Sequence, residues 1–190
     1  VIAEPAEGSV TNVAAYNGTV AGADGFVTVR DGHFVDGKGQ SIRFLATNLT
    51  FQEAFPEKER APEIARRMAR LGINCVRFHH MDCHHSPRGI WDPAYEDRQH
   101  VDAEQLDRLD WIIYQLKQHG IYTNLNLHVS RKFREADGFE KYDERPKYDK
   151  GLDNFEPRMI ELQKQYARDL LTHVNPYTKT AYVDEPCIAM

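Results

Sequence analysis

The sequence repeats one local unit, in which an amphipathic helix stops at a glycine and an isoleucine at once opens an apolar strand. The unit occurs at Arg70-Leu-Gly72-Ile73 and again at Gln118-His-Gly120-Ile121. Helices commonly end where a glycine takes the left-handed conformation, so each glycine marks a helix end. Strands and helices that alternate with such short turns predict parallel strands joined by right-handed crossovers.

Three helices are predicted from the spacing of their apolar residues. The first has Pro62 in its first turn, the second follows the capping pair Asp102 and Gln105, and the third begins near Pro157. Residues that recur every three or four positions place one face of a helix on a core. The expected faces are Ile64, Met68 and Leu71, then Leu106, Leu109, Ile113 and Leu116, then Met159, Leu162, Tyr166 and Leu170.

Short β-type runs precede and separate these helices. Runs at Phe26–Val29, His33–Val35 and Ser41–Leu45 are divided by Asp-Gly and Gly-x-Gly turns, and they predict a hairpin whose last strand ends at Asn48. Further strands are expected at the two repeated units. After Pro186, the run Cys187–Met190 is expected to begin one more strand.

The unequal lengths of the connections favour a barrel over a doubly wound sheet. Turns from helix to strand are very short, whereas the connections after Phe78 and Leu127 are several times longer, and barrels build their active sites from such loops. A nucleotide-binding sheet needs a glycine-rich turn after its first strand, and Asn48-Leu-Thr-Phe51 has no glycine. The predicted α/β fold is the N-terminal portion of a (β/α)₈ TIM barrel, with strands 1 to 3 and the start of strand 4, preceded by a β-hairpin. Residues 1–25 are expected to form an extended lead-in, and residues 26–190 the barrel portion.

The charge balance narrows the classes of partner. The 24 basic and 29 acidic residues give a net charge of -5, which offers no general basic field to a nucleic-acid backbone. We therefore expect no nucleic-acid partner. No apolar run is long enough to cross a bilayer, so we expect no membrane partner either. The three cysteines, Cys75, Cys83 and Cys187, are scattered and predict no disulfide framework. We expect a secreted or periplasmic protein whose signal peptide is not in this chain, and a cytoplasmic location stays open.

Polar residues gather towards the end of the strand that starts at Ile121. With a period of two, Tyr122, Asn124, Asn126 and His128 share one face, which suits the barrel interior. Polar side chains there need hydrogen-bond partners. Because barrel enzymes place catalytic groups at the carboxyl ends of strands, we favour a catalytic role for His128 over that of a structural histidine.

The preceding strand also ends in polar residues. Arg77 lies among apolar neighbours and must be paired, most simply with a carboxylate in the barrel mouth. His79 and His80 follow it directly. Trp91, in the next loop, could offer its ring to the face of a sugar, and ordinary burial is the alternative.

A run of histidines after this strand permits a second class of function. The segment His79–His85 contains four histidines, Asp82 and Cys83, and imidazole and thiolate are ligands of zinc and copper. A metal-dependent TIM-barrel hydrolase is therefore one alternative. Adjacent histidines on a strand point to opposite faces, and no His-x-His pair is present, so no residue is assigned as a metal ligand. A non-catalytic carbohydrate-binding barrel is the other alternative.

These residues resemble a clan of retaining (β/α)₈ glycoside hydrolases that includes the cellulase-like family 5 and the β-galactosidase-like family 2. The resemblance spans residues 26–190 and rests on the hairpin before strand one, on Arg77 and His80 in Arg-Phe-His-His, and on the run Asn-Leu-Asn-Leu-His128. It implies an enzyme that cleaves β-linked polysaccharide or oligosaccharide by double displacement, with no cofactor. Arg77 and His128 would support catalysis. The residues expected to bind substrate are Asn48, His79, His80, Trp91 and Asn126.

The catalytic carboxylates that this resemblance implies have no counterpart in the chain. In the clan, an Asn-Glu pair at the end of strand four supplies the acid/base and a glutamate on strand seven supplies the nucleophile. Both are therefore expected beyond Met190, and the chain alone is expected to be inactive without the remainder of the same barrel. Carboxylates of the long loop, such as Glu135 and Asp143, are not expected to form the rigid pair, about 5 Å apart, that retaining hydrolysis requires.

Overall fold

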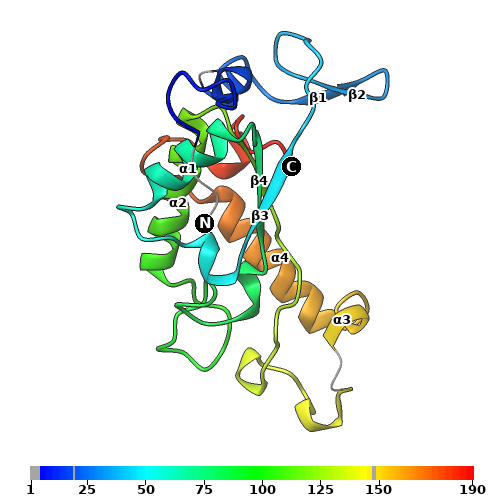
Figure 1. The fold of residues 1–190 in the computed structure, drawn as a ribbon. Helices are drawn as coiled ribbons and strands as arrows, with labels where there is room; N and C mark the ends of the chain where they lie inside the picture. The colour runs from blue at the N-terminus through cyan, green and yellow to red at the C-terminus, as the bar shows by residue number, and fades with distance from the viewer. Residues whose placement is uncertain (1–4, 19, 147–148) are drawn as a thin grey trace.

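A three-stranded parallel sheet lies at the centre of the computed structural model, which describes residues 5–18, 20–146 and 149–190. The strands β3 (Ala46–Thr50), β4 (Cys75–His79) and β5 (Tyr122–Leu125) lie side by side in that order. Figure 1 shows the first two of them. Their parallel pairing confirms the crossover topology expected from the repeated unit.

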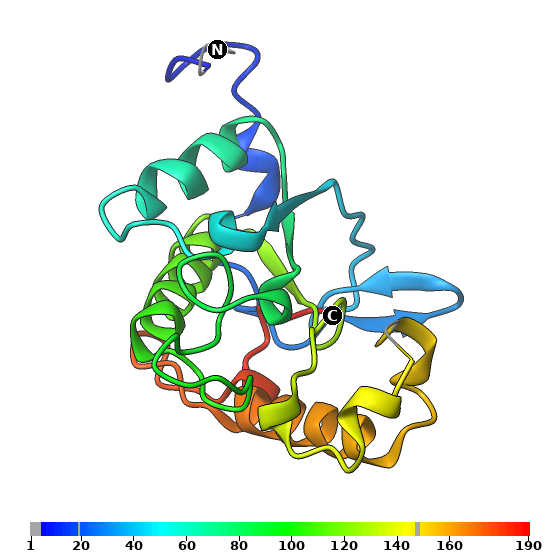
Figure 2. The ribbon, with the colours of Figure 1, turned by 90° about the horizontal axis from the view of Figure 1, so that it is seen from below.

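Three helices form a half ring on one side of the strands. Helices α1 (Ala61–Arg70), α2 (Ala103–Gln118) and α4 (Pro157–Thr172) follow β3, β4 and β5 in turn, and Figure 2 shows them in an arc. Gly72 and Gly120 have φ angles of 78° and 69°, so both helix ends use the left-handed conformation that the sequence predicted. None of the helices in the described ranges is long and apolar enough to cross a bilayer.

The last residues of the chain begin a fourth strand. Thr123 forms a parallel bridge with Ile188, the Thr123 amide donates to the carbonyl of Cys187 at 2.8 Å, and the Leu125 amide donates to that of Met190 at 2.8 Å. This segment lies against β5 on the side away from β4. The described strands do not close into a ring, as expected for the N-terminal portion of a barrel.

Side-chain carboxylates cap the starts of the two long helices, and the sequence analysis predicted the first of these caps. The carboxylate of Asp102 accepts the amide of Gln105 at 2.9 Å at the start of α2, and Glu156 accepts the amide of Met159 at 2.6 Å at the start of α4. The predicted apolar face of α4 is buried over its whole length. Leu109, Ile113 and Leu116 of α2 are fully buried as well.

Helix α1 buries a different face from the predicted one. Its core residues are Ala61, Ala65 and Ala69, whereas Leu71 is 41% exposed, and Ile64 and Met68 are only half-buried on the flank. Small side chains let this helix lie close to the sheet and to α2, where larger residues would not fit. The predicted stripe for the first helix was therefore wrong.

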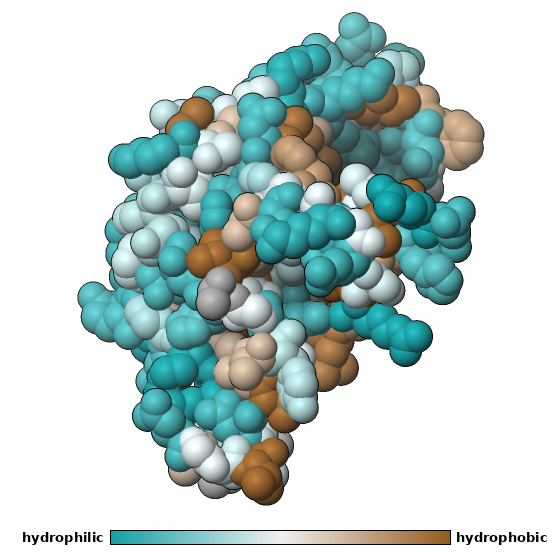
Figure 3. Space-filling model, turned by 90° about the horizontal axis from the view of Figure 1, so that it is seen from above, coloured by the Kyte–Doolittle hydropathy of each residue, from teal (hydrophilic) through white to brown (hydrophobic). Residues whose placement is uncertain are grey.

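A β-hairpin closes the end of the sheet at which the strands begin. Strands β1 (Thr28–Arg30) and β2 (His33–Val35) pair antiparallel, and Ser41 extends the hairpin by one bridge to Val35. The rest of the predicted third run is not a strand, and β3 belongs to the parallel sheet. Seen from this end, the surface is mostly hydrophilic with scattered apolar patches (Figure 3).

The lead-in folds into turns and is not extended. It contains a 3₁₀ helix, η1 (Ala14–Asn17), and Asn17 donates from its side chain to the carbonyl of Ile73 at 2.7 Å. A side chain at Gly22 would lie 2.5 Å from the backbone of Pro186, so glycine permits a close approach below the sheet. Turns form because backbone groups of this segment bond to the ends of the helices and strands above it. Residues 1–4 of the predicted lead-in lie outside the described ranges.

Candidate active site

Polar side chains occupy the face of the sheet that the helices leave open. The strand register aligns Asn48, Arg77 and Asn124 in one layer, and Thr50 and His79 in the next layer towards the strand ends. The alternating residues, such as Val76 and Phe78, are fully buried under the helices. The period-two interpretation of the strands is thus confirmed. Asn48 is exposed and donates or accepts no side-chain hydrogen bond among the described residues.

Arg77, His79 and Asn126 meet at one oxygen atom. Asn126 Oδ1 accepts a hydrogen bond from Arg77 Nε at 2.7 Å and lies 2.8 Å from His79 Nδ1. Because Arg77 Nε can only donate, the facing atom of Asn126 is the oxygen, and His79 must carry its proton on Nδ1. The Nε2 atom of a neutral His79 then remains an acceptor.

The expected carboxylate partner of Arg77 is not found among the described residues. The side-chain amide of Asn126 takes its place. Its neutral oxygen accepts the hydrogen bond from Arg77 Nε but does not neutralise the guanidinium. The two terminal nitrogens of Arg77 donate to no described residue, so its positive charge stays uncompensated. The site therefore offers a cation and two fixed donors on the open face, where an anionic group could bind.

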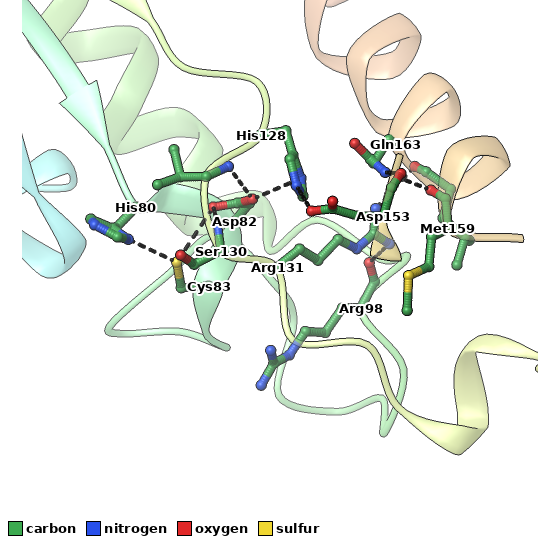
Figure 4. Close-up of polar contacts among 12 residues, drawn as sticks. His80, Asp82, Cys83, Arg98, His128, Ser130, Arg131, Asp153, Met159 and Gln163 are labelled. Atoms are coloured by element: carbon green, nitrogen blue, oxygen red, sulfur yellow. Dashed lines mark hydrogen bonds and ion pairs between the residues drawn. The ribbon is translucent and has the colours of Figure 1, made fainter. Parts of the chain in front are cut away.

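His128 lies between two carboxylates that the sequence analysis did not assign to the site. Its Nε2 is 2.6 Å from Asp153 Oδ2, and its Nδ1 is 3.5 Å from Asp82 Oδ2 (Figure 4). Asp82 also accepts the backbone amide of Val129 at 2.9 Å. Asp82 stood in the sequence only as part of the histidine-rich run, and Asp153 stood in a long loop with no local signal for its partner.

These two carboxylates cannot act as a glycosidase pair. Asp82 is 1% exposed and Asp153 is 7% exposed. Their oxygens are engaged by His128 and by backbone amides, including that of Gly151 at 2.8 Å from Asp153. They instead hold the end of β5 and the following loop in one arrangement, with His128 as the link.

Phe51 and His80 stand in matching positions at the ends of β3 and β4. Each directly follows its strand, each has a left-handed backbone (φ 51° and 61°), and their rings stack with centroids 4.7 Å apart. Such a backbone is unfavourable for residues other than glycine and often marks a functional site. The Nδ1 atom of His80 lies 3.2 Å from Cys83 Sγ, and burial lowers the pKa of His80.

Trp91 is a core residue and not a sugar-stacking platform. It is 1% exposed, and its indole nitrogen donates to the carbonyl of Asp82 at 2.8 Å. Its ring packs on Tyr166, and the guanidinium of Arg131 lies 4.5 Å from the ring centroid. Both faces of the ring are thus unavailable to a ligand, and the predicted role in substrate binding was wrong.

The histidine-rich run does not converge on a common point. The ring of His79 faces Asn126, that of His80 faces Phe51 and Cys83, and His85 Nε2 lies 2.9 Å from the carbonyl of Asp97. Burial raises the pKa of Cys83 to about 12, which disfavours the thiolate that binds metals. Within the part of the chain that the structure describes, no three histidine, cysteine, aspartate or glutamate residues form a metal-binding group.

The described part of the long loop after β5 packs around a small core of its own. Phe133, Met159 and Leu162 are buried together, and Arg131 donates to the carbonyl of Leu162 at 2.9 Å. Burial lowers the pKa of Arg131 to about 10. The described part of this loop, which includes Asp153, therefore forms a wall beside the ends of the strands.

Solved structures share this fold. The chain superposes on an endo-1,4-β-mannanase from Rhizomucor miehei with a TM-score of 0.63 and 20% identity, covering 86% of this chain and 46% of that chain. A glycoside hydrolase family 5 mannosidase from the same organism gives a TM-score of 0.61 and 14% identity over the same shares. The chain therefore has the fold of the N-terminal part of the (β/α)₈ barrel in these structures.

A third structure that superposes on the chain is the exo-β-1,4-mannosidase Op5Man5 from Opitutaceae bacterium strain TAV5. It gives a TM-score of 0.53 and 25% identity, covering 80% of this chain and 26% of that chain. The chain spans less than half of the length of each of these structures. No protein-family model and no curated protein sequence matches the chain.

The position of the polar residues within this barrel fold defines the candidate active site. Arg77, His79 and Asn126 lie at the carboxyl ends of adjacent strands, the end at which barrel enzymes carry their active sites. Of the predicted residues, the structure brings these three together, places Asn48 in the layer of Arg77, and places His80 and His128 at the rim.

Proposed function

We propose that this chain is the N-terminal half of a retaining glycoside hydrolase that acts on a β-linked polysaccharide or oligosaccharide. The observation that supports it best is the shared contact of Arg77 and His79 with Asn126 Oδ1, on the open face of a family 5 barrel fold. The solved neighbours are mannanases and mannosidases, so β-1,4-mannan is the first substrate to test.

In this proposal the residues of the chain position groups that the rest of the barrel provides. The free nitrogens of Arg77 bind the carboxylate of a nucleophilic glutamate and keep it ionised, because an adjacent positive charge lowers a carboxyl pKa. The Nε2 atom of His79 accepts a hydrogen bond from a sugar hydroxyl. His128, held by Asp82 and Asp153, keeps the end of β5 in place beside the first sugar.

The proposed reaction has two steps on two glutamates that follow Met190. One glutamate protonates the glycosidic oxygen as the other attacks the anomeric carbon, so that the leaving sugar departs and a glycosyl ester forms. The first glutamate then takes a proton from water, which attacks the ester, releases the sugar and restores the nucleophile. The configuration at the anomeric carbon is retained.

The gene itself provides the first test. Its reading frame should continue beyond Met190 and encode an Asn-Glu pair within a few residues, at the end of the strand that begins at Cys187. The whole gene product should hydrolyse a β-linked glycan, and proton NMR of early products should show the retained anomer. A reading frame that stops at Met190, an inverted product, or binding without hydrolysis would contradict the proposal.

A further inference from the structure

Four basic side chains lie together at the edge of the candidate active site. His84 and Arg88 follow β4, Arg98 lies further along the same connection, and Lys132 follows β5; we call these four the basic cluster. Burial is the largest cause that lowers the pKa of His84, followed by the charges of Arg88, Arg98 and Lys132, with a smaller contribution from His80. The charges of all three cations thus act on His84.

Ring contacts connect the basic cluster to the active site. The Arg88 guanidinium lies 4.7 Å from the centroid of the Phe51 ring, and the His84 ring lies 5.7 Å from it. Phe51 stacks on His80, whose ring lies 4.0 Å from that of His79. Phe51 and His80 thus connect His84 and Arg88 of the basic cluster to His79 of the candidate active site.

The cations of the basic cluster have no acidic partner in the described ranges. Arg88, Arg98 and Lys132 form no ion pair there, whereas Arg108, for comparison, binds both Glu57 and Glu104. The chain as a whole has a net charge of -5, so acidic residues are not scarce. Unpaired cations in one place create a local positive potential that favours an anion.

Arg98 is the clearest sign of a missing partner. It is 3% exposed, and its Nε and Nη1 atoms are buried without a hydrogen bond. Its backbone is fixed at both ends, because its amide donates to Asp137 Oδ1 at 3.0 Å and its carbonyl accepts from Arg131. Figure 4 shows its guanidinium extended away from His128 and Asp153.

An unpaired, buried guanidinium is costly for a folded protein. Burial and the charge of Arg134 lower the pKa of Arg98, and the nearby carboxylates of Asp137 and Asp82 form no hydrogen bond with its guanidinium. An anion that reaches Arg98 would satisfy these donors with charge-assisted hydrogen bonds.

We propose that the basic cluster binds an anionic substituent, a carboxylate or a sulfate ester, on a sugar of the substrate. The substrate class is then an acidic glycan, with the charged sugar next to the one at the Arg77 and His79 site. This inference rests on the proposed function for its location. It adds a negative charge to the proposed substrate. The names of the solved neighbours refer only to mannan and mannose, which are neutral.

Calorimetry with the whole gene product tests the inference. The probes are three oligosaccharides of equal length with the same backbone: one neutral, one carrying a uronic acid and one carrying a sulfate ester. At least one acidic probe should bind about 10- to 100-fold more tightly than the neutral one, which is the effect of one or two charge-assisted hydrogen bonds. The preference should fall as salt is raised, because exposed charges are screened. The acidic probe that binds more tightly identifies the substituent.

Substitutions of the exposed cations assign the effect to the basic cluster. The double variant Arg88→Gln with Lys132→Gln should lose most of the preference and keep its affinity for the neutral probe. Lys164→Gln, an exposed change of the same charge on α4, is the matched control and should keep the preference. Arg98→Met should abolish the preference as well, and the exposed double variant decides the matter if Arg98→Met does not fold.

Two results would overturn the inference: equal binding of the neutral and both acidic probes, or a full preference in the exposed double variant. Hydrolysis of neutral glycans with no acidic preference would end the inference and leave the glycosidase proposal in place. Acidic binding that depends on the basic cluster, in a protein that hydrolyses no glycan, would support the inference and end the glycosidase proposal.

Discussion

The Nε2 atom of His128 lies 2.6 Å from Asp153 Oδ2, although the two residues stand at opposite ends of the long connection between β5 and α4. The contact closes that connection into a loop whose base is fixed at the end of a barrel strand. Asp82 lies on the other side of the same ring, with its Oδ2 atom 3.5 Å from Nδ1. Loss of either carboxylate should loosen the wall of the candidate site.

Asp153→Asn should destabilise the protein by about 1 to 3 kcal/mol, because it removes the negative charge and one of the two acceptor oxygens of a nearly buried carboxylate that faces His128 and the Gly151 amide. Chemical denaturation of the whole gene product measures the change. Glu144→Gln, at an exposed carboxylate in the same loop whose one ion pair among the described residues is with Lys141, is the control and should change stability by less than about 0.5 kcal/mol. Equal stabilities of the two variants would show that the His128 contact has no energetic role.

Trp91→Ala should reduce stability by about 3 to 5 kcal/mol, since it removes a fully buried aromatic ring and leaves a cavity. The denaturant midpoint should fall, while an undenatured sample should bind oligosaccharides of different length with unchanged relative affinity. Tyr95→Ala, at a position 45% exposed, is the control. If the variant has normal stability but binds long oligosaccharides poorly, Trp91 contacts the substrate and is not a core residue.

Arg77→Lys should lower the kcat of the whole gene product about 100-fold, with little change in stability. Lysine keeps the positive charge, but its single nitrogen cannot donate to Asn126 and also present two fixed donors to a carboxylate. The catalytic carboxylate would then be misplaced, and small misplacements of catalytic groups lower the rate strongly. Arg43→Lys, an exposed residue before the start of β3, is the control. Normal kcat in Arg77→Lys would mean that the guanidinium does not position a reacting group.

Acid should destabilise the protein through His80 and His84. Burial is the largest cause that lowers the pKa of each from its ordinary value of 6.5, so the folded state binds protons less readily than the unfolded chain. Stability is then fully present above about pH 6.5 and falls as the pH drops through that value, because the unfolded state gains protons first.

Thermal melts at pH 7.5 and 5.5 test this assignment by comparison with a variant. The loss of melting temperature between the two pH values should be smaller in His84→Gln than in the unchanged protein. His100→Gln, at a histidine that pairs with Asp97 on the surface, should leave the loss nearly unchanged. Identical losses in all three proteins would mean that His84 does not sense the pH of the solution.

The order of strands and helices could be predicted because its signals are local. Gly72 and Gly120 end helices wherever such a glycine follows an amphipathic run, and Asp102 caps α2 through a residue three positions away. The β-type run after Pro186 likewise specified the start of a fourth strand. Each of these signals acts within a few residues and needs no knowledge of the partner elements.

Side-chain environments were predicted less well, because they depend on distance between elements. Helix α1 offered two apolar faces, and only its close approach to α2 and the sheet selected the alanine face. The sequence alone did not decide whether Trp91 is exposed or buried. In the structure its indole nitrogen donates to the carbonyl of Asp82 and the guanidinium of Arg131 packs on its ring, which places it in the core.

The sequence by itself determined the alternation of strands and helices, the open polar face of the sheet, and the place of Arg77, His79 and His128 at the strand ends. Only the tertiary structure decided the partners of these residues. Parallel register brought Asn126 to Arg77 and His79, and the folding back of the long loop brought Asp153 to His128. Periodicity specifies which face a side chain occupies, whereas contact between distant segments follows from how the packed elements meet in space.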